Sequence, residues 1–517
     1  MLIKKHPSVV IVGAGPTGLT AGNLLGMAGI DTIIFESNAS LSDCPKAIAF
    51  DDEGLRICQA MGLSDVVLKD VLLDIDAHYI SAGHFLAKVT PTNKRNGYPL
   101  ISTFHQPAFE ATLLQGLQRF KCVSIHFQHT VETFEQTDSN VIVSVRTLDG
   151  TLLKIECAYL LACDGGKSSI RRALNIPMDG STFAQKWLVI DSIADENPST
   201  VVTFFCNPKR PAVTVPAPHQ GRRWEFMLLP GEQEEDLLQQ EKIHALISEV
   251  GGPAHPQIIR QAIYTFHAAL AQSFSKGRIF LLGDAAHMMP PFGGQAMNSG
   301  LRDAHNLCWK LQLVLQGLAS PQLLDTYHQE RYRHVAQMIW FSSFLGGVVM
   351  TKLPLVALFR DIVFRTLNRI PPTRKFLSEV GLKPLPRYKK GFMLSKGGRG
   401  NRAVAGLMLP QPEVMTSQGK RVPLDDVLGT GFSVLRLHDD AAEAFAPLAS
   451  QADMWERLNA HFVCVQPETS NEMSDFLQNR RDIFVVVRPD RYIYGVFKEQ
   501  NVEAFISSLR RDLAPNG

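Results

Sequence analysis

The most constraining feature of this chain is a glycine-rich turn that stands between a short apolar strand and a helix. Residues 8–12 read SVVIV, the turn reads Gly13-Ala14-Gly15-Pro16-Thr17-Gly18, and residues 19–29 carry small and apolar residues at helical spacing. A second apolar run ends on Glu36, which lies 36 − 18 = 18 residues beyond the last glycine. Strand, glycines, helix, strand and acid in this order predict a dinucleotide-binding βαβ unit.

Each residue type in this turn has a separate physical role. Gly13 permits the tight turn, Gly15 lets the backbone approach a pyrophosphate, and Gly18 lets helix and strand pack closely. Pro16 suits the first helical turn, where its missing N–H is not needed. The free N–H groups of that turn and the helix dipole favour phosphate, while Glu36 can accept bonds from a ribose diol. The alternative, a glycine-rich turn with no ligand, is disfavoured because all five parts occur in order.

The bulk properties exclude several classes of protein. At 517 residues the chain is too long for one ordinary core, and about three domains are expected. A net charge of +2 predicts no nucleic-acid partner and no electrostatic capture by anionic membranes. The eight cysteines show no CxxC and no Cys/His metal spacing, which predicts reduced thiols in a cytoplasm and no bound metal. We recognise no signal peptide and expect a cytoplasmic protein.

The uncharged segment 335–351 resembles a membrane span at first sight. It contains polar residues and a Gly-Gly pair, and it is shorter than the ~20 strongly apolar residues that a span needs. We therefore predict a buried or interface helix and no membrane span, with peripheral membrane contact as the alternative.

Three apolar strands of this sequence end in small glycine-containing turns, two of which carry an aspartate. These turns are residues 13–18, Asp164-Gly165 and Gly283-Asp284. In a parallel sheet such turns gather at the carboxyl edge, where ligands bind. One dinucleotide lying along that edge accounts for all three. Because only one complete fingerprint is present, we expect a retained dinucleotide and a nicotinamide cofactor that visits transiently.

At this point a family resemblance becomes specific. Residues 283–298, which read GDAAHMMPPFGGQAMN, resemble the second FAD motif of the class A (single-component) FAD-dependent aromatic hydroxylases. The turn CDGG at 163–166 resembles the Asp-Gly motif of that family. Further similarity lies at residues 47–53, 226–232, 323–331 and 486–491, so that it extends from about residue 8 to the end.

The resemblance implies an α/β fold with a Rossmann-like FAD-binding domain, an inserted β-sheet substrate domain and a C-terminal thioredoxin-like domain. We assign residues 1–75, 104–178 and 272–367 to the FAD-binding domain, and residues 76–103 and 179–271 to the substrate-binding sheet domain. Residues 368–402, rich in Pro, Gly, Lys and Arg, are predicted to be a solvated linker, and residues 403–517 form the C-terminal domain. That domain lacks CxxC, which favours an assembly role over a redox role. A homodimer is left open.

The resemblance also implies a reaction. NAD(P)H would reduce a non-covalently bound FAD, and O₂ would then form a flavin C4a-hydroperoxide that hydroxylates a phenolic or hydroxylated (hetero)aromatic substrate, as in aromatic catabolism. Two alternatives stay open: another oxygen insertion on the same fold, such as epoxidation or antibiotic modification, and a flavin-binding interaction protein without turnover. The sequence does not determine the substrate or the choice between NADH and NADPH.

The resemblance assigns roles to individual residues. Glu36 would bind the ribose and Asp284 the ribityl chain, while Pro291 would place its carbonyl near the reacting hydroxyl of the substrate. The implied cofactor residues are Gly13, Gly15, Pro16, Thr17, Gly18, Glu36, Lys46, Gln106, Val131, Asp164, Gly283, Asp284, Gly294, Gln295, Ala296, Met297 and Asn298, and the implied substrate residues are Phe226 and Phe292. Two positions depart from the family pattern. Lys46 replaces an arginine and loses its planar fork, and Ala296 replaces a glycine and adds a methyl group near the flavin ring.

The sequence does not identify the base that activates a phenol, although such a base is expected to touch the substrate hydroxyl. Candidates by chemistry fall into three groups. The histidines are His219 and His287, the cations that could attract a carboxylate are Lys209, Arg210, Arg222 and Arg223, and the aromatic side chains that could line a pocket are Trp187, Phe205, Trp224 and Phe226. Each group has an ordinary structural alternative, namely a structural histidine, exposed solubilising charge and half-buried strand packing.

Overall fold

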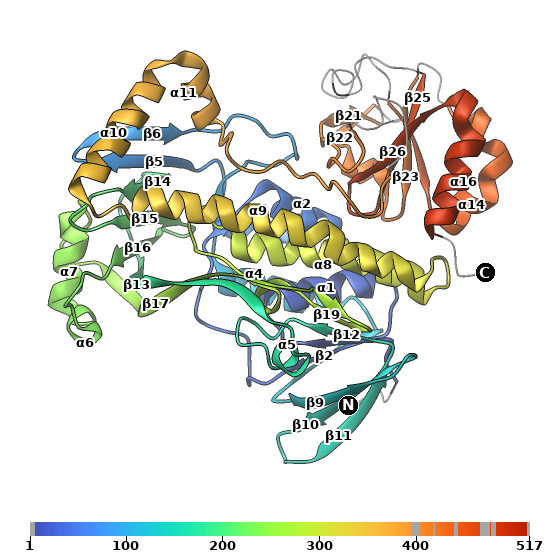
Figure 1. The fold of residues 1–517 in the computed structure, drawn as a ribbon, viewed down its shortest axis with the longest axis horizontal. Helices are drawn as coiled ribbons and strands as arrows, with labels where there is room; N and C mark the ends of the chain where they lie inside the picture. Colours follow the sequence, from blue (N-terminus) through green and yellow to red (C-terminus); the bar gives the residue numbers. More distant parts are fainter. Residues whose placement is uncertain are drawn as a thin grey trace.

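The predicted βαβ unit lies at the centre of a six-stranded sheet in the computed structural model, which describes residues 6–394, 404–416, 419–438, 443–465, 476 and 482–513 (Figure 1). The strand order is β18-β19-β12-β1-β2-β8. The strands are β1 (Val9–Val12), β2 (Thr32–Glu36), β8 (Val123–Phe127), β12 (Tyr159–Ala162), β18 (Ser275–Lys276) and β19 (Ile279–Leu281). Because β1, β2, β12 and β19 pair in parallel, the three turns that follow β1, β12 and β19 meet at one edge of the sheet, as predicted.

Helices cover this sheet closely because small residues face it. Helix α1 (Pro16–Met27) begins with a proline in its first turn and packs against α8 (Gln295–Leu315) and α4 (Gln106–Leu117). A Cβ atom at Gly18 would overlap the backbone oxygen of Gly13, so this helix can start so near the strand only with glycine there. Shorter elements around this unit are β3 (Ala49–Phe50), α2 (Asp52–Ala60), α3 (Ser64–Val67), β4 (Val71–Leu72), β7 (Ser102–Phe104), β9 (Thr130–Gln136), β10 (Val141–Arg146), β11 (Leu152–Cys157) and α5 (Ser169–Ala173).

An eight-stranded sheet joins residues 76–89 to residues 178–288 in the order β20-β17-β13-β16-β15-β14-β5-β6. Its strands are β5 (Asp76–Ser81), β6 (His84–Val89), β13 (Met178–Ile193), β14 (Val201–Phe205), β15 (Ala212–Ala217), β16 (Gly221–Met227), β17 (Gln257–Ala271) and β20 (His287–Met288). Helices α6 (Glu234–Leu237) and α7 (Gln240–Glu249) follow β16, and α7 packs in one apolar core with residues of β13 and β16. The other face of the sheet is therefore left to line a cavity.

Two long helices cross the molecule side by side, α8 and α9 (Asp325–Val349), and α10 (Pro354–Arg369) and α11 (Pro371–Ser378) follow next to β6 (Figure 1). In the part of the chain that the structure describes, no one helix has both the length and the apolar character to cross a membrane. Segments 321–349 and 354–369 meet these criteria only as a pair, and that pair is bent by 111°. As predicted, segment 335–351 belongs largely to a helix whose inner side is buried at Val335, Met338 and Phe341.

The prediction of a solvated linker at 368–402 is wrong for its described part, which ends at residue 394. This stretch completes α10, forms α11, and anchors the Lys383 ammonium 3.1 Å from the carboxylates of both Asp51 and Asp52. The Pro-Pro pair that suggested a linker begins a helix instead, since proline is favoured in a first helical turn. Residues 395–402 lie outside the described residues.

The C-terminal residues form a four-stranded sheet in the order β24-β23-β25-β26. Its strands are β23 (Ser433–Leu437), β24 (His461–Val465), β25 (Ile483–Val487) and β26 (Ile493–Lys498), and the neighbouring elements are β21 (Glu413–Met415), β22 (Arg421–Pro423), α13 (Asp425–Leu428), α14 (Ala452–Arg457) and α16 (Val502–Leu513). Strands β23 and β24 are parallel, whereas β25 is antiparallel to both β23 and β26. The thioredoxin-like character of this unit stays a prediction.

Candidate active site

A cavity of about 810 Å³ extends from the glycine-rich turn to the inner face of the eight-stranded sheet. Its volume lies within the range of cavities that hold a cofactor or a drug-sized ligand. The walls come from the ends of β1, β2 and β12, the first turn of α8, the strands β13 to β17, and α9 to α11 with the segment that follows. Thus the cavity connects the two units that the sequence assigns to a dinucleotide and to a substrate.

The glycine-rich turn leaves open space in front of its backbone. Gly15 lines the cavity, and a Cβ atom there would meet no protein atom within 4 Å. Gly13 has φ +104°, a conformation that favours glycine. The Glu36 carboxylate accepts hydrogen bonds from the backbone N–H of Ala14 at 2.8 Å and of Asn38 at 2.9 Å. Its Oε1 also accepts from the side chains of Asn38 at 2.7 Å and Ser37 at 3.3 Å, so the acceptor position that is left for a ribose hydroxyl lies on Oε2.

Three predicted cofactor residues support this wall without lining the cavity: Gly18, Gly283 and Asn298. Gly283 has φ +58°, and a Cβ atom there would lie 2.6 Å from the Thr17 Oγ1. The Asn298 amide donates to the backbone oxygens of Ala49 at 3.2 Å and Gly294 at 2.8 Å. Gly18 thus has the packing role that the sequence predicts, and the space or the bonds of Gly283 and Asn298 are used by the surrounding protein. A cofactor contact by these residues stays a prediction.

The loop around Lys46 is held by its backbone. Gln106 accepts hydrogen bonds from the backbone N–H groups of Lys46 at 2.7 Å and Ala47 at 2.6 Å, and its own amide donates to Glu110 at 2.7 Å. Lys46, Gln106 and Val131 all line the cavity, as their predicted cofactor roles require. The side chain of Gln106 therefore positions the loop, while the ammonium group of Lys46 is left for a ligand phosphate.

Two carboxylates at the sheet edge have acceptor capacity directed at the cavity. Asp164 accepts a hydrogen bond from the backbone N–H of Ser169 at 2.8 Å through one oxygen, while its other oxygen is buried and has no partner among the described residues. Asp284 is accessible from the cavity, and the protein that surrounds it raises its pKa, an effect that the charges of His287 and Lys46 oppose. Hydroxyl and amide donors of a flavin nucleotide match such carboxylates, so these residues fit FAD.

The start of helix α8 forms another part of the cavity wall. Gly294, at φ +62°, precedes the helix, and no side chain caps the free N–H groups of its first turn. Gln295, Ala296 and Met297 line the cavity, so the positive end of the helix dipole faces a bound ligand. The carbonyl of Pro291, also on the cavity, already accepts a hydrogen bond from the Gly294 N–H at 2.8 Å.

Three of the aromatic side chains that were predicted to line the pocket face the opposite side of the sheet, and their strand neighbours line the cavity instead. Phe226 packs on the far face of the sheet with α7 and does not line the cavity, and Trp224 and Phe205 belong to that same far core. Because successive strand residues point to opposite faces, the cavity receives Phe204 and Glu225 instead. Phe292 does line the cavity, as predicted. Behind it stands Trp187, with ring centroids 5.7 Å apart.

Glu225 is a further candidate for a functional residue, which the sequence analysis does not identify. It lies in the middle of β16 and pairs with Val189 of β13 and Val213 of β15, both of which also line the cavity. Its exposed fraction is 8%, and no residue that the structure describes donates a hydrogen bond to its carboxylate. Burial raises its pKa, and Arg223 opposes this effect. The signal was an acid set between Trp224 and Phe226 in an apolar strand.

Arg223 is the one cation of the predicted set that lines the cavity. Arg223 and Arg260 bind the same carboxylate, Asp191, each at 2.7 Å, and both donate to the carbonyl of Pro45. Two guanidinium groups thus share Asp191, and Arg223 also interacts with Glu225 on the same wall. Arg210 is instead paired with Glu232, Arg222 is paired with Asp195, and Lys209 does not line the cavity.

Neither predicted histidine base reaches the cavity. His219 has a side chain that is 66% exposed and lies 2.7 Å from Asp70. His287 is fully buried, and its Nε2 lies 2.7 Å from Asp303, which also binds Arg331. Each histidine therefore pairs with an acid away from the cavity, and neither is a candidate for the base.

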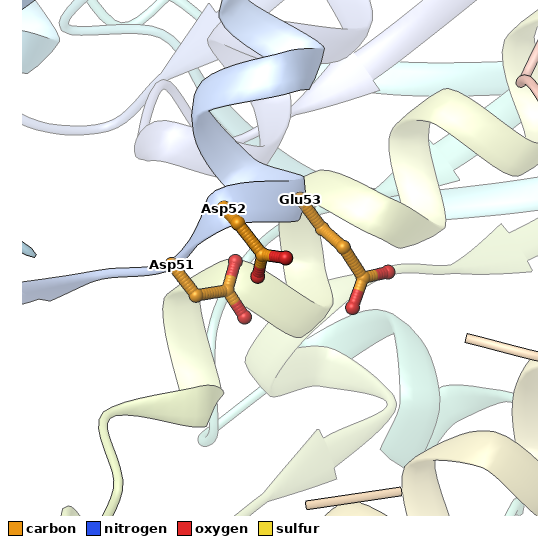
Figure 2. A group of neighbouring side chains, drawn as sticks. All are labelled: Asp51, Asp52 and Glu53. Carbon is orange, nitrogen blue, oxygen red and sulfur yellow. The ribbon is translucent and has the colours of Figure 1, made fainter. Parts of the chain in front are cut away.

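Three acids at the start of α2 gather beside the cavity: Asp51, Asp52 and Glu53 (Figure 2). Their oxygens lie within 4.8 Å of one another, which is a spacing that could hold a metal ion. However, Lys383 lies 3.1 Å from Asp51 and Asp52, and Arg302 lies 3.0 Å from Glu53. Although burial raises the pKa of Asp51, Arg302 and Lys383 bring it below its ordinary value. Two cations thus face three acids, and burial raises the pKa of Glu53, so the cluster is a buried polar joint between α2, α8 and the residues after α11.

The sequence matches two protein families and is similar to named bacterial hydroxylases. The FAD binding domain family matches residues 6–342, and the HcaD C-terminal domain family matches residues 406–512. The chain is 37% identical to a 3-(3-hydroxy-phenyl)propionate/3-hydroxycinnamic acid hydroxylase of Escherichia coli O81 (strain ED1a), over 97% of this chain and 94% of the relative. It is 36% identical to the protein of the same name from Klebsiella pneumoniae subsp. pneumoniae, over 98% and 95%.

Solved structures share the fold across the whole length. The flavin-dependent monooxygenase PieE, in complex with FAD and substrate, aligns with a TM-score of 0.83 at 21% identity over 99% of both chains. Aklavinone-11 hydroxylase, in a ternary complex with FAD and aklavinone, aligns with a TM-score of 0.79 at 21% identity over 99% of this chain and 100% of that one. At such identities the likeness shows the fold.

Proposed function

Because the chain belongs to the family of FAD-dependent aromatic hydroxylases, we propose that it hydroxylates a small phenol that carries a short acidic side chain, with Glu225 as the base that activates the phenol. The bacterial relatives are named for 3-(3-hydroxyphenyl)propionate and 3-hydroxycinnamic acid, and both are phenols of this kind. The FAD and the aromatic hydroxylase chemistry belong to the family; the substrate and the base are the proposal.

One observation carries the proposal: a single carboxylate stands on the apolar sheet wall of the cavity. Among the described lining residues, Glu36, Glu110, Asp164 and Asp284 lie near the nucleotide end, and Glu225 alone comes from the eight-stranded sheet. Its neighbours on that wall are apolar or aromatic side chains, which suit a benzene ring.

Bound FAD, reduced by NAD(P)H, supplies the activated oxygen of the new hydroxyl group. Glu225 would take the proton of the substrate hydroxyl, because a carboxylate with a raised pKa is a stronger base and burial raises the pKa of this one. The resulting phenolate ring is richer in electrons and reacts more readily. The Arg223 guanidinium, which lines the cavity, would bind the acidic side chain, and the apolar walls would exclude water.

Turnover of the FAD-loaded Glu225→Gln variant tests this assignment, because glutamine keeps the shape and removes the base. Loss of general-base catalysis predicts a kcat about 10²–10⁴-fold lower, with FAD affinity unchanged. Glu225→Asp should recover part of the rate. In the wild-type enzyme kcat should rise with pH as Glu225 loses its proton, and the Gln variant should lose that limb. NAD(P)H consumption and product mass are the readouts; wild-type turnover in the Gln variant would refute the role of Glu225.

A further inference from the structure

Helix α10 carries its apolar side chains on its outer side, the reverse of an ordinary surface helix. Its exposed residues follow the spacing i, i+3, i+4 and i+7, which places them on one face. These residues, the outer stripe, are Leu355, Leu358, Phe359 and Ile362, with exposed fractions of 82, 57, 69 and 54%. The helix lies on the outside of β6 with α11 (Figure 1).

The inner face of α10 carries a buried polar pair beside the apolar Ala357 and Phe364, and the bonds of this pair fix the orientation of the helix. Arg360 and Asp361 are buried with exposed fractions of 7 and 8%. Arg360 donates to Asp361 at 2.9 Å and to the backbone oxygens of Val348 and Cys206, both at 2.8 Å, while Asp361 accepts from Ser81 at 2.7 Å. Turning the outer stripe inward would leave this pair without its partners, which is costly. The apolar face is therefore held toward the outside.

The charges around the outer stripe are almost all positive. Segment 351–378 contains six basic residues and one acidic residue, so its net charge is 6 − 1 = +5, and its one acid, Asp361, is paired with Arg360. Lys352 precedes the stripe and Arg369 follows it. The chain as a whole carries only +2, a sum that does not show this local excess.

We propose that α10 docks in the plane of an anionic lipid surface, with the outer stripe immersed in the interface and the flanking cations on the lipid headgroups. An exposed apolar face bordered by Lys and Arg is the pattern of interfacial helices, and anionic lipids attract such flanking cations. This inference stands on α10 alone and does not depend on the proposed substrate.

A second copy of the chain fits this surface less well. If two α10 helices meet about a two-fold axis perpendicular to them, Lys352 of one copy lies near Arg369 of the other, and if the axis runs along them, each cation lies near its counterpart in the other copy. Like charges held close together oppose association. An anionic lipid surface, in contrast, satisfies the apolar stripe and both flanking cations together.

Docking through α10 would also place the cavity near the lipid. Phe364, on the same helix, and Leu377, on α11, line the cavity. The docked surface is therefore one helix away from the space proposed for an aromatic substrate, and small aromatic acids that collect at a bilayer interface would be close to it.

Co-sedimentation of the full-length FAD-loaded protein with vesicles tests the inference. We expect binding to vesicles of phosphatidylcholine and phosphatidylglycerol in equal amounts, little binding to pure phosphatidylcholine, and weaker binding as salt rises, since salt screens exposed charges. Leu355→Ser with Phe359→Ser should lower the bound fraction about tenfold or more. Lys352→Gln with Arg369→Gln should lower binding to the anionic vesicles only.

Leu148→Ser is the matched control, because Leu148 is also an exposed leucine, at 72%, in the loop between β10 and β11. This variant should bind as the wild type does, and bound FAD and the melting temperature should show that every variant is folded. Equal binding to both vesicle types, or none to either, would overturn the proposal. A dimer in solution that the Leu355/Phe359 variant dissociates would assign the surface to a second copy instead.

Discussion

Glu330→Gln removes one charge from a fully buried network between α9 and the C-terminal unit. The Glu330 carboxylate lies 2.8 Å from Arg488 and 2.8 Å from Lys310, and all three side chains have an exposed fraction of 0%. Asp490 completes the network as a second partner of Arg488. Two cations thus face two carboxylates, and the glutamine variant would leave one buried positive charge without compensation.

The expected loss of stability follows from this imbalance. Removing one partner of a buried ion pair costs about 3–5 kcal/mol. The C-terminal unit, residues 403–517, is only slightly longer than the domains that lose about 4–8 °C of melting temperature per kcal/mol, so at about 4 °C per kcal/mol its transition should fall by about 12–20 °C. A chain with several domains does not unfold in two states, so each calorimetric transition must be followed separately.

Acid should produce the same loss in the wild-type protein. Although burial raises the pKa of Glu330, Arg488 and Lys310 lower it to about 2, whereas its ordinary value is 4.5. A carboxyl whose pKa is lower in the folded state stabilises the fold above its ordinary pKa and loses this contribution as pH falls toward the folded value. We therefore expect the C-terminal transition of the wild type to weaken between about pH 4.5 and 2, and that of the variant to respond much less.

Calorimetry and limited proteolysis measure both effects. Glu499→Gln is the control, because Glu499 is 61% exposed and lies 3.5 Å from Arg436, an exposed geometry that contributes little. If Glu330→Gln melts at the temperature of this control, the network does not attach the C-terminal unit in the way described.

Three further results are expected. Asp284→Ala should weaken FAD binding about 10- to 150-fold in a flavin-fluorescence titration, since a hydrogen bond to a charged group contributes about 1.5–3 kcal/mol; unchanged affinity would mean that Asp284 is misassigned. Ala296→Gly should lower the H₂O₂ released per NAD(P)H consumed, because Ala296 puts a methyl group on the cavity wall; an unchanged peroxide yield would refute this role. Phe204→Ala should raise the KM for the phenol more than Phe205→Ala does, because Phe204 faces the cavity and Phe205 the far core, and equal effects would contradict the register.

The central sheet could be predicted from the sequence because its signals are local. A glycine turn fixes the close approach of α1 to the sheet, and parallel strands bring their carboxyl ends to one edge whatever lies between them. The predicted turns at Gly15, Asp164 and Asp284 accordingly line one cavity. The local pattern alone predicts a dinucleotide, and the family resemblance identifies that dinucleotide as FAD.

The facing of the inserted strands could not be predicted in the same way. Both faces of β16 carry large or charged side chains, so the alternation of Trp224, Glu225 and Phe226 does not show which face meets the cavity. Only the position of α7 on one side decides this, and it is a tertiary contact. Composition misled at Lys383 for a related reason, since a lysine in a Pro- and Gly-rich stretch looks solvated until the buried acids that bind it are known.

Lys46 stands where the family has an arginine, and the backbone bonds of Lys46 explain why the loop tolerates this change. Its N–H donates to Gln106 at 2.7 Å, and its carbonyl accepts from Arg223 at 3.1 Å, so the loop keeps its course whichever side chain stands there. Arg223 also stands two residues before Glu225, and both line the cavity. The strand that presents the proposed base to the substrate is thus the strand that holds the loop beside the nucleotide. The Arg223 guanidinium donates to the carbonyls of Pro45 and Lys46 in that loop. An acidic ligand at Arg223 would compete with these carbonyls for the same N–H donors. Occupancy of the substrate end and the geometry of the cofactor end are therefore coupled through one side chain.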